Sequence, residues 1–290
     1  MCGILGVSSI KHKDNNLFLS ALSSITHRGR NNQDFVYLDQ HKTYFGHTRL
    51  SILDTSDYAN QPMWDSTGQF LIIFNGEVYN FKEIKEKIQN TKTILWRSSG
   101  DTEVIIEAYV LWGPKCVEML RGFFAFSIYD SKTGDIFIVR DRLGIKPLYY
   151  LHDESEIVFA SEIRPFEKLK LTKKLNKNSF SGFLRYGSFV SKETPYEGIQ
   201  MLEPGHSLFY RKASNSIEKK CYWSIDWSDK YNASREEILK KIQNELLQSV
   251  NLRLISDVPL GIFLSGGIDS SALVSLAKEF RSDIDTFSVV

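Results

Sequence analysis

Short apolar runs and helical patterns alternate along the chain up to Tyr210. A strand is predicted at 69–74, where the nearly continuous apolar run Phe70-Leu71-Ile72-Ile73-Phe74 should be buried on both faces. Apolar residues at helical spacing predict one helix from Leu17 to near Gly29 and another that Asp101 opens and Gly113-Pro114 stops. Further strands are expected at 4–8, 44–53, 123–129, 136–140, 147–151, 157–160 and 207–211. This pattern predicts a sheet protein with helices on its faces.

The pattern changes after Tyr210. The polar, aperiodic segment 212–220 predicts a surface connection. Ser234, with Glu237 three residues on, forms a capping-box signature for a long amphipathic helix. That helix carries one apolar face, made of Ile238, Ile242, Leu246, Val250 and Leu254.

A buried strand (261–264), a helix (271–280) and an apolar strand (285–290) complete a parallel α/β unit. We therefore expect a first domain at 1–211, a connector at 212–233 and the start of a second domain at 234–290. One such unit leaves apolar faces uncovered, so the chain is expected to be the amino-terminal part of a longer protein.

Composition narrows the class of protein. Of 290 residues, 42% are hydrophobic and 24% charged, which is an ordinary globular balance, and the net charge of +1 gives no reason to expect nucleic acid or an anionic membrane as partner. The three cysteines are scattered, so neither a disulfide framework nor the paired spacing of a zinc site is present, and no metal site is expected. No apolar run reaches the ~18 residues of a membrane helix, and the amino terminus lacks signal-peptide features. A cytoplasmic location is the expectation.

Cys2 is the first candidate for catalysis. Once Met1 is removed, the thiol has its own α-amine within reach, and an amine with a pKa of about 7.7–8.0 can act as a local base at neutral pH. A thiolate can attack a carboxamide carbon, expel ammonia and leave a thioester that water opens. From position alone, Cys2 is equally well explained as a small buried residue at the start of a strand.

Four further positions fit this chemistry. Asn75 and Gly76 follow the buried strand and can donate hydrogen bonds to a developing oxyanion, although Asn-Gly is also a common turn pair. Arg49 can bind the carboxylate of an amino acid, and Asp101 its ammonium group. Asp101 is also explained as a helix N-cap.

The segment Leu264-Ser265-Gly266-Gly267-Ile268-Asp269-Ser270-Ser271 lies between an expected strand and helix. Glycine N–H groups, serine hydroxyls and a helix N-terminus favour a phosphate. The lysine of a Walker loop is absent, so pyrophosphate, released as ATP is split to AMP, fits better than a β/γ-phosphate. A structural tight turn is the less favoured alternative.

Together these motifs resemble the glutamine-dependent asparagine synthetases. The shared motifs are 2–4, 27–29, 49–52, 75–80, 99–103, 121–126, 140–149 and 265–271, and they stand in the family's order and spacing. The resemblance covers the whole chain. One departure is Arg30-Asn31, where the family has Pro-Asp, which frees a backbone φ and adds a charge beside the expected glutamine pocket.

For the first domain the resemblance implies an α+β N-terminal-nucleophile fold, an αββα sandwich with class II glutaminase activity. Cys2 would be the nucleophile, and Asn75 and Gly76 would form the oxyanion hole. The residues implied to hold glutamine are Arg49, Leu50, Ser51, Ile52, Leu53, Asn75, Gly76, Glu77 and Asp101.

For the second domain the resemblance implies the start of an α/β PP-loop ATP pyrophosphatase. In this family ATP, Mg²⁺ and aspartate give β-aspartyl-AMP, which ammonia delivered through an internal tunnel converts to asparagine. The residues implied to bind ATP are Leu264, Ser265, Gly266, Gly267, Asp269, Ser270, Ser271 and Val289. The aspartate-binding residues of the family lie beyond position 290, so this chain alone is expected to make no AMP from ATP and aspartate. Small-molecule substrates are the expected partners, and a homodimer is compatible with the family.

Three alternatives remain at this point. Other class II amidotransferases, such as glucosamine-phosphate synthase and amidophosphoribosyltransferase, would share Cys2 and the glutamine site but would lack the Ser265-Gly266-Gly267 loop. A relative from surface-polysaccharide biosynthesis would amidate a sugar acid in place of aspartate. A non-catalytic remnant is disfavoured by the intact Cys2 and glutamine-site residues.

Overall fold

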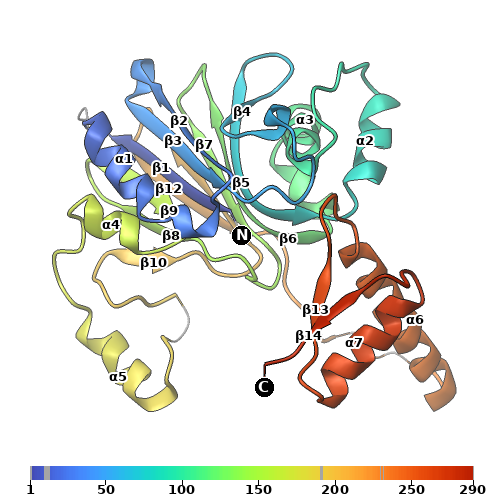
Figure 1. The fold of residues 1–290 in the computed structure, drawn as a ribbon. Coiled ribbons are helices and arrows are strands. Elements are labelled where there is room, and N and C mark those ends of the chain that lie inside the picture. The colour runs from blue at the N-terminus through green and yellow to red at the C-terminus, as the bar shows by residue number, and fades with distance from the viewer. Residues whose placement is uncertain (1, 10–13, 190–191, 229, 231, 290) are drawn as a thin grey trace. The chain divides into compact units, whose positions relative to one another are not determined.

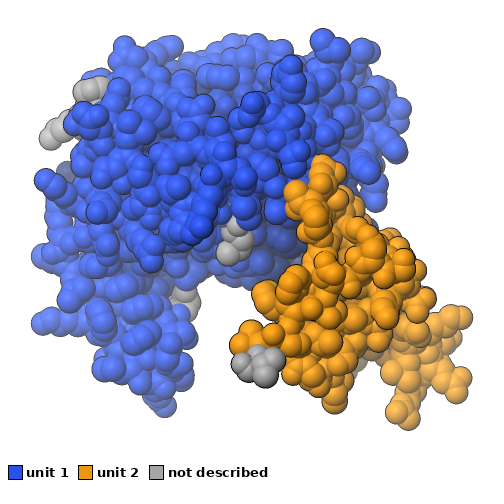
Figure 2. All heavy atoms as spheres, in the orientation of Figure 1, with its two compact units in different colours: residues 1–224 blue, residues 225–290 orange. Residues whose placement is uncertain are grey.

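The computed structural model describes residues 2–9, 14–189, 192–228, 230 and 232–289. By its internal contacts the chain divides into two compact units, residues 1–224 and 225–290 (Figure 2).

The first unit contains two six-stranded sheets whose neighbouring strands are antiparallel. The first sheet has the order β10-β8-β9-β1-β3-β2. Its strands are β1 (Gly3–Ser9), β2 (Asn32–Leu38), β3 (Thr43–Arg49), β8 (Tyr149–His152), β9 (Glu156–Ala160) and β10 (Ile199–Met201). The second sheet has the order β12-β11-β7-β6-β5-β4. Its strands are β4 (Met63–Trp64), β5 (Phe70–Val78), β6 (Gly122–Asp130), β7 (Ile136–Arg140), β11 (His206–Arg211) and β12 (Ser216–Cys221).

The two sheets face each other across one apolar core. Phe45 and Phe159 of the first sheet pack in the same buried cluster as Ile73 and Tyr129 of the second. A second cluster covers the outer face of the first sheet, where Phe18 and Phe166 bury against it from two helices. The layers are therefore helix, sheet, sheet and helix, with α1 and α4 on one side and α2 and α3 on the other (Figure 1).

The helices of this unit are α1 (Asn15–Ser23), α2 (Phe81–Gln89), α3 (Asp101–Trp112), α4 (Arg164–Lys168) and α5 (Lys177–Tyr186). Short 3-10 turns occur at Thr26–Arg28, Asp39–His41, Asp57–Ala59 and Gly113–Met119. The αββα sandwich expected from the sequence is confirmed by this arrangement.

Several expected elements differ at their ends. The strand expected at 44–53 ends at Arg49. The first helix, expected to reach Gly29, ends at Ser23, and a separate 3-10 turn follows at Thr26–Arg28. The strand expected at 69–74 continues to Val78, since Asn75 and Gly76 pair with β6. The turn interpretation of Asn75-Gly76 is therefore wrong. The N-cap of α3 is Gly100, so the N-cap interpretation of Asp101 is wrong as well.

The segment 212–220 was expected to be a surface connection, and this is wrong. Residues 216–221 form β12, which pairs with β11 from His206–Cys221 to Arg211–Ser216. β12 is an edge strand with exposed lysines, and such charges are typical of sheet edges. The boundary of the compact unit consequently lies at Ser224, after the expected end at residue 211.

The second unit contains α6 (Arg235–Arg253), β13 (Gly261–Phe263), α7 (Ile268–Lys278) and β14 (Asp285–Phe287). β13 and β14 pair in parallel, which confirms the expected α/β unit. The capping box of Ser234 and Glu237 is present. The strand at 261–264 was expected to be buried, but Phe263 is 79% exposed. The last residue of the strand expected at 285–290 lies outside the described residues.

Within the described ranges, no helix has both the length and the apolar character needed to cross a membrane.

Candidate active site

A cavity of about 450 Å³ in the first unit collects most of the residues expected to handle glutamine. Those that line it are Cys2, Arg49, Leu50, Ile52, Leu53, Asn75, Gly76, Glu77 and Asp101. Ser51 is the exception, because it does not line the cavity and its N–H donates to Asn31 Oδ1 at 3.1 Å. Asn31, which stands where the resembled family has Asp, thus helps to hold the loop beside the cavity.

Cys2 immediately precedes β1 and lies against the loop that follows β3. The Leu50 N–H donates to Cys2 Sγ at 3.3 Å, and Cys2 Sγ lies 3.7 Å from the Leu50 carbonyl oxygen. Burial raises the pKa of the Cys2 thiol, whereas the Leu50 N–H and the positive charges of the amino terminus and Lys146 lower it. Arg28 Nε donates to the Cys2 carbonyl oxygen at 2.9 Å and so fixes the backbone of the nucleophile candidate.

Asn75 is wholly buried in β5, and neither its Nδ2 nor its Oδ1 has a hydrogen-bond partner in the described part of the chain. A buried amide without partners costs stability, so its retention at a cavity wall points to a ligand that completes it. Gly76 follows, and a Cβ at this position would lie 2.2 Å from the Phe123 carbonyl oxygen of the neighbouring strand. Only glycine therefore fits between β5 and β6 here.

Arg49 is buried at the end of β3 and binds the loop that follows it. Its Nη1 donates to the Ser56 carbonyl and to Asn60 Oδ1, both at 2.7 Å, and its Nη2 donates to the carbonyls of Leu53 and Asp54. To bind a carboxylate in bidentate fashion, Arg49 must exchange some of these bonds for bonds to the ligand.

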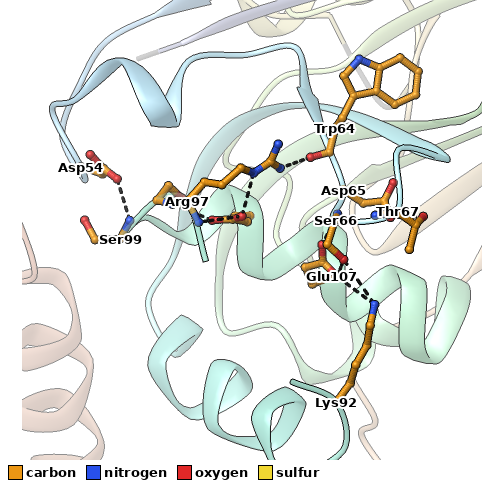
Figure 3. Close-up of polar contacts among 11 residues, drawn as sticks. Asp54, Trp64, Asp65, Ser66, Thr67, Lys92, Arg97, Ser99 and Glu107 are labelled. Carbon is orange, nitrogen blue, oxygen red and sulfur yellow. Dashed lines mark hydrogen bonds and ion pairs between the residues drawn. The ribbon is translucent and has the colours of Figure 1, made fainter. Parts of the chain in front are cut away.

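Asp54 ties the same loop to the segment before α3. Its carboxylate accepts the Ser99 N–H at 2.7 Å (Figure 3) and the Ser56 N–H at 3.1 Å. These bonds hold the pKa of Asp54 below its ordinary value despite burial, which acts in the opposite direction.

Two buried acids anchor α3 itself. Glu103 accepts the Ser98 N–H at 2.8 Å and Arg97 Nε at 3.2 Å, and Arg97 also reaches the Trp64 carbonyl. Glu107 accepts the Ser66 hydroxyl at 3.0 Å (Figure 3). Because α3 is fixed in this way, its first residue is held at the cavity.

That first residue is Asp101, whose carboxylate accepts the Val78 N–H at 2.8 Å. Burial raises its pKa to about 7, and the nearby charge of Glu77 acts in the same direction, while the Val78 N–H opposes the rise. Burial also raises the pKa of Glu77, with Lys146 opposing. Two acids with raised pKa values in one cavity are ready to receive a cationic group.

Several residues that line the cavity were not predicted from the sequence. They are Ala59, Gln61, Phe74, Gly100, Thr102, Phe123, Ile145 and Lys146. Gln61 and Thr102 bond to each other at 3.2 Å, so they support the wall. The segment 140–149 belongs to a motif that the sequence analysis recognised, and this was the available signal for Ile145 and Lys146.

The loop of the second unit places its serines together. Ser265 Oγ lies 3.1 Å from Ser270 Oγ, and Ser270 Oγ donates to the Gly267 carbonyl at 3.1 Å. α7 begins at Ile268, and Gly266 has a φ of 77° with no atom within 4 Å of an added Cβ. Open glycine backbone before a helix N-terminus suits a phosphate.

The remaining residues of the expected ATP site lie around this loop. The Leu264 N–H donates to the Phe287 carbonyl at 2.8 Å, and Val289 is 96% exposed. Asp269 lies in the first turn of α7, and Ser271 is exposed. No cluster of three or more His, Cys, Asp or Glu that could hold a metal ion occurs among the described residues.

Two protein families match the chain by sequence. The family described as "Glutamine amidotransferase domain" matches residues 1–223, and the family described as "Asparagine synthase" matches residues 241–290. Asparagine synthetase [glutamine-hydrolyzing] 1 of Bacillus subtilis is 33% identical, over 100% of this chain and 46% of its own length. Amidase chry2 of Gibberella zeae is 34% identical, over 89% of this chain and 38% of its own length. The chain thus spans 38–59% of the length of the curated relatives that it matches.

Among solved structures, the glutamine phosphoribosylpyrophosphate amidotransferase of B. subtilis, complexed with ADP and GMP, matches with a TM-score of 0.56 and 17% identity. The match covers 99% of this chain and 65% of that one, and it supports the fold. The sandwich of two sheets, the cavity at Cys2 and the match over residues 1–223 all point to the same family. The chain belongs to the glutamine amidotransferase domain family, and its last fifty residues match the start of the asparagine synthase family.

Proposed function

We propose that the first unit hydrolyses glutamine at Cys2 and supplies the released ammonia to an ATP-dependent synthetase. The observation that carries this proposal is the joint placement, in one cavity, of the Cys2 thiol and the partnerless carboxamide of Asn75. A nucleophile needs such donors beside it, because the attacked carbonyl oxygen becomes negative.

In the proposed reaction, the α-amine freed by removal of Met1 accepts the thiol proton. Sγ then attacks the side-chain carbonyl carbon of glutamine, and the oxygen becomes an oxyanion. Asn75 Nδ2 and the Gly76 N–H donate to this oxygen. The amine returns its proton to the departing nitrogen, which leaves as ammonia, and water opens the Cys2 thioester to glutamate.

The same cavity supplies groups for the rest of glutamine. The Asp101 carboxylate receives the α-ammonium group, and Glu77 adds a second negative charge nearby. Arg49 receives the α-carboxylate, with 50–53 forming the adjoining wall. The network of Asp54 and Arg49 fixes this wall before the ligand arrives, which reduces the entropy lost on binding.

For the second unit we propose that 265–271 holds the pyrophosphate of ATP, with Leu264 and Val289 beside the adenosine. ATP and aspartate would react to β-aspartyl-AMP, which ammonia converts to asparagine. Mg²⁺ would neutralise phosphate charge, with Asp269 as the nearby carboxylate. Aspartate as acceptor rests on the relatives named asparagine synthetase, and the sugar acid remains the alternative. A cytoplasmic location, a homodimer and the absence of nucleic-acid or membrane partners stay predictions.

The replacement Cys2→Ala tests the glutaminase. It is expected to abolish glutamate release from glutamine while the circular dichroism spectrum stays unchanged, because the change is small and lies before β1. Cys221→Ala, an exposed cysteine of β12, is the matched control and should keep full activity. Glutamate release by Cys2→Ala at the wild-type rate would refute the proposal.

A further inference from the structure

Lys146 lines the same cavity as Cys2 and has no part in the reaction described above. Lys146 is only 6% exposed, which is unusual for a lysine. Among the residues that the structure describes, its amine has neither a hydrogen bond nor an ion pair within 4 Å. A buried cation without a bound partner is costly, so its presence at this cavity requires a reason.

The loop that carries Lys146 is held by its own two charged neighbours. Asp141, which is 1% exposed, accepts the Lys146 N–H at 2.9 Å and the Ile145 N–H at 3.0 Å. Arg140 Nε donates to the Lys146 carbonyl at 2.8 Å, and its Nη2 donates to the Gly144 carbonyl at 2.6 Å. The backbone on both sides of Lys146 is therefore fixed, so the position of its side chain is built into the fold.

The side chain itself packs against the cavity wall. Lys146 Nζ lies 4.4 Å from the centroid of the Phe123 ring, an attractive cation–π contact. Glu77, which lies opposite Phe123 in the β5–β6 pairing, lines the same cavity. The amine thus lies over an aromatic ring in a cavity that the Glu77 carboxylate and the Cys2 thiol also line.

We propose that the Lys146 ammonium is the fixed cation that stabilises the negative charge of the Cys2 sulfur before it attacks the carbonyl carbon of glutamine. This inference rests on the proposed glutamine hydrolysis. In it, Lys146 gains and loses no proton: the thiol proton still passes to the α-amine and then to ammonia. Lys146 acts through space on Cys2, so it is a positioning residue and not a catalytic one.

The surrounding charges fit this assignment. The side-chain charges that act on Cys2 are those of Lys146 and Arg49, which favour the thiolate, and that of Asp101, which opposes it. Burial, with Arg28 acting in the same direction, holds the pKa of Lys146 below its ordinary value, while Glu77, Cys2 and Asp141 act against this lowering. The three negative groups thus favour the charged amine that the inference requires.

The test measures the thiol directly. Iodoacetamide alkylation of Cys2 is followed by mass spectrometry against pH, without glutamine, in a Cys221→Ser background that removes the exposed thiol. Lys146→Met and Lys146→Gln keep the aliphatic stem against Phe123 and serve as two independent neutral variants. Lys146→Arg keeps the charge, and Lys115→Met, at an exposed lysine outside the cavity, is the control.

Each neutral variant is expected to move the alkylation midpoint up by about 0.5–1 pH unit, which lowers the rate at pH 7 about three- to tenfold. Lys146→Arg and Lys115→Met should match the parent. An unchanged midpoint in the neutral variants, or a rise in the KM for glutamine alone, would overturn the inference. If the parent protein releases no glutamate but the midpoint still moves, the proposed function fails while the effect of Lys146 on the thiol stands.

Discussion

Replacing Asn75 by alanine separates catalysis from stability. Asn75 is fully buried, and both polar atoms of its side chain lack partners within the described residues. Loss of one oxyanion donor lowers kcat about 100- to 1,000-fold, or about 2.7–4 kcal/mol of transition-state stabilisation. Each unpaired buried polar group, in contrast, costs the folded protein about 1–3 kcal/mol. Their removal offsets the packing lost with the side chain, so the free energy of unfolding should fall by less than about 1 kcal/mol, or rise.

The assay combines steady-state glutamate release with urea unfolding of wild-type and Asn75→Ala protein. Ser127→Ala is the matched control, since Ser127 is also fully buried in a strand, its hydroxyl has no partner among the described residues, and it does not line the cavity. That control should leave kcat unchanged. A kcat of Asn75→Ala within threefold of wild type would show that the carboxamide has no role at the oxyanion, and the reasoning would be wrong.

Three further predictions concern Asp101 and Gly76 in the cavity wall. Since burial raises the pKa of Asp101 to about 7, its carboxylate is lost as the pH falls through 7, and this adds about a tenfold fall per pH unit in kcat/KM for glutamine to the fall that protonation of the α-amine causes. Asp101→Asn should remove the added fall and leave the one due to the α-amine, along with a loss of most of the activity. Between pH 3.8, its ordinary pKa, and pH 7, the Asp101 carboxyl binds more protons in the folded protein than in the unfolded protein. The free energy of unfolding should therefore decrease as the pH rises through that range. Urea titrations of Asp101→Asn should lack this slope. Gly76→Ala should lower the free energy of unfolding by about 3 kcal/mol, because its Cβ would strike the Phe123 carbonyl. Gly68→Ala, whose Cβ would lie in open space, should lower it by about 1 kcal/mol. Equal losses of the two variants in urea unfolding would contradict this.

The sequence predicted the strands well and their ends less well. The apolar run at 70–74 is visible to periodicity, but its extension to Val78 depends on pairing with β6, which no local pattern contains. Likewise β12 carries Ile217 beside Glu218, Lys219 and Lys220 and has no alternating apolar pattern. It is a strand because the edge of β11 pairs with it. Tertiary pairing overrides local preference in both cases.

The candidate site was predicted mainly through motifs and not through geometry. The sequence analysis chose Cys2, Asn75 and Asp101 by chemical type, and the structure brings them to one cavity. Lys146 was not predicted as a site residue, because lysine side chains are normally exposed. Its burial results from a loop that Arg140 and Asp141 hold from within, a network that becomes visible only in three dimensions.

The pairing of β5 with β6 also limits how this gene can change in length. Asn75 stands opposite Ala125 and Gly76 opposite Phe124. Successive side chains of a strand point to opposite faces, so one codon inserted or deleted within 70–74 would slip the strand and turn the carboxamide away from the thiol. Codons gained at the bend around Gly68 would leave the pairing intact. Insertions are therefore tolerable at that bend and harmful a few residues later.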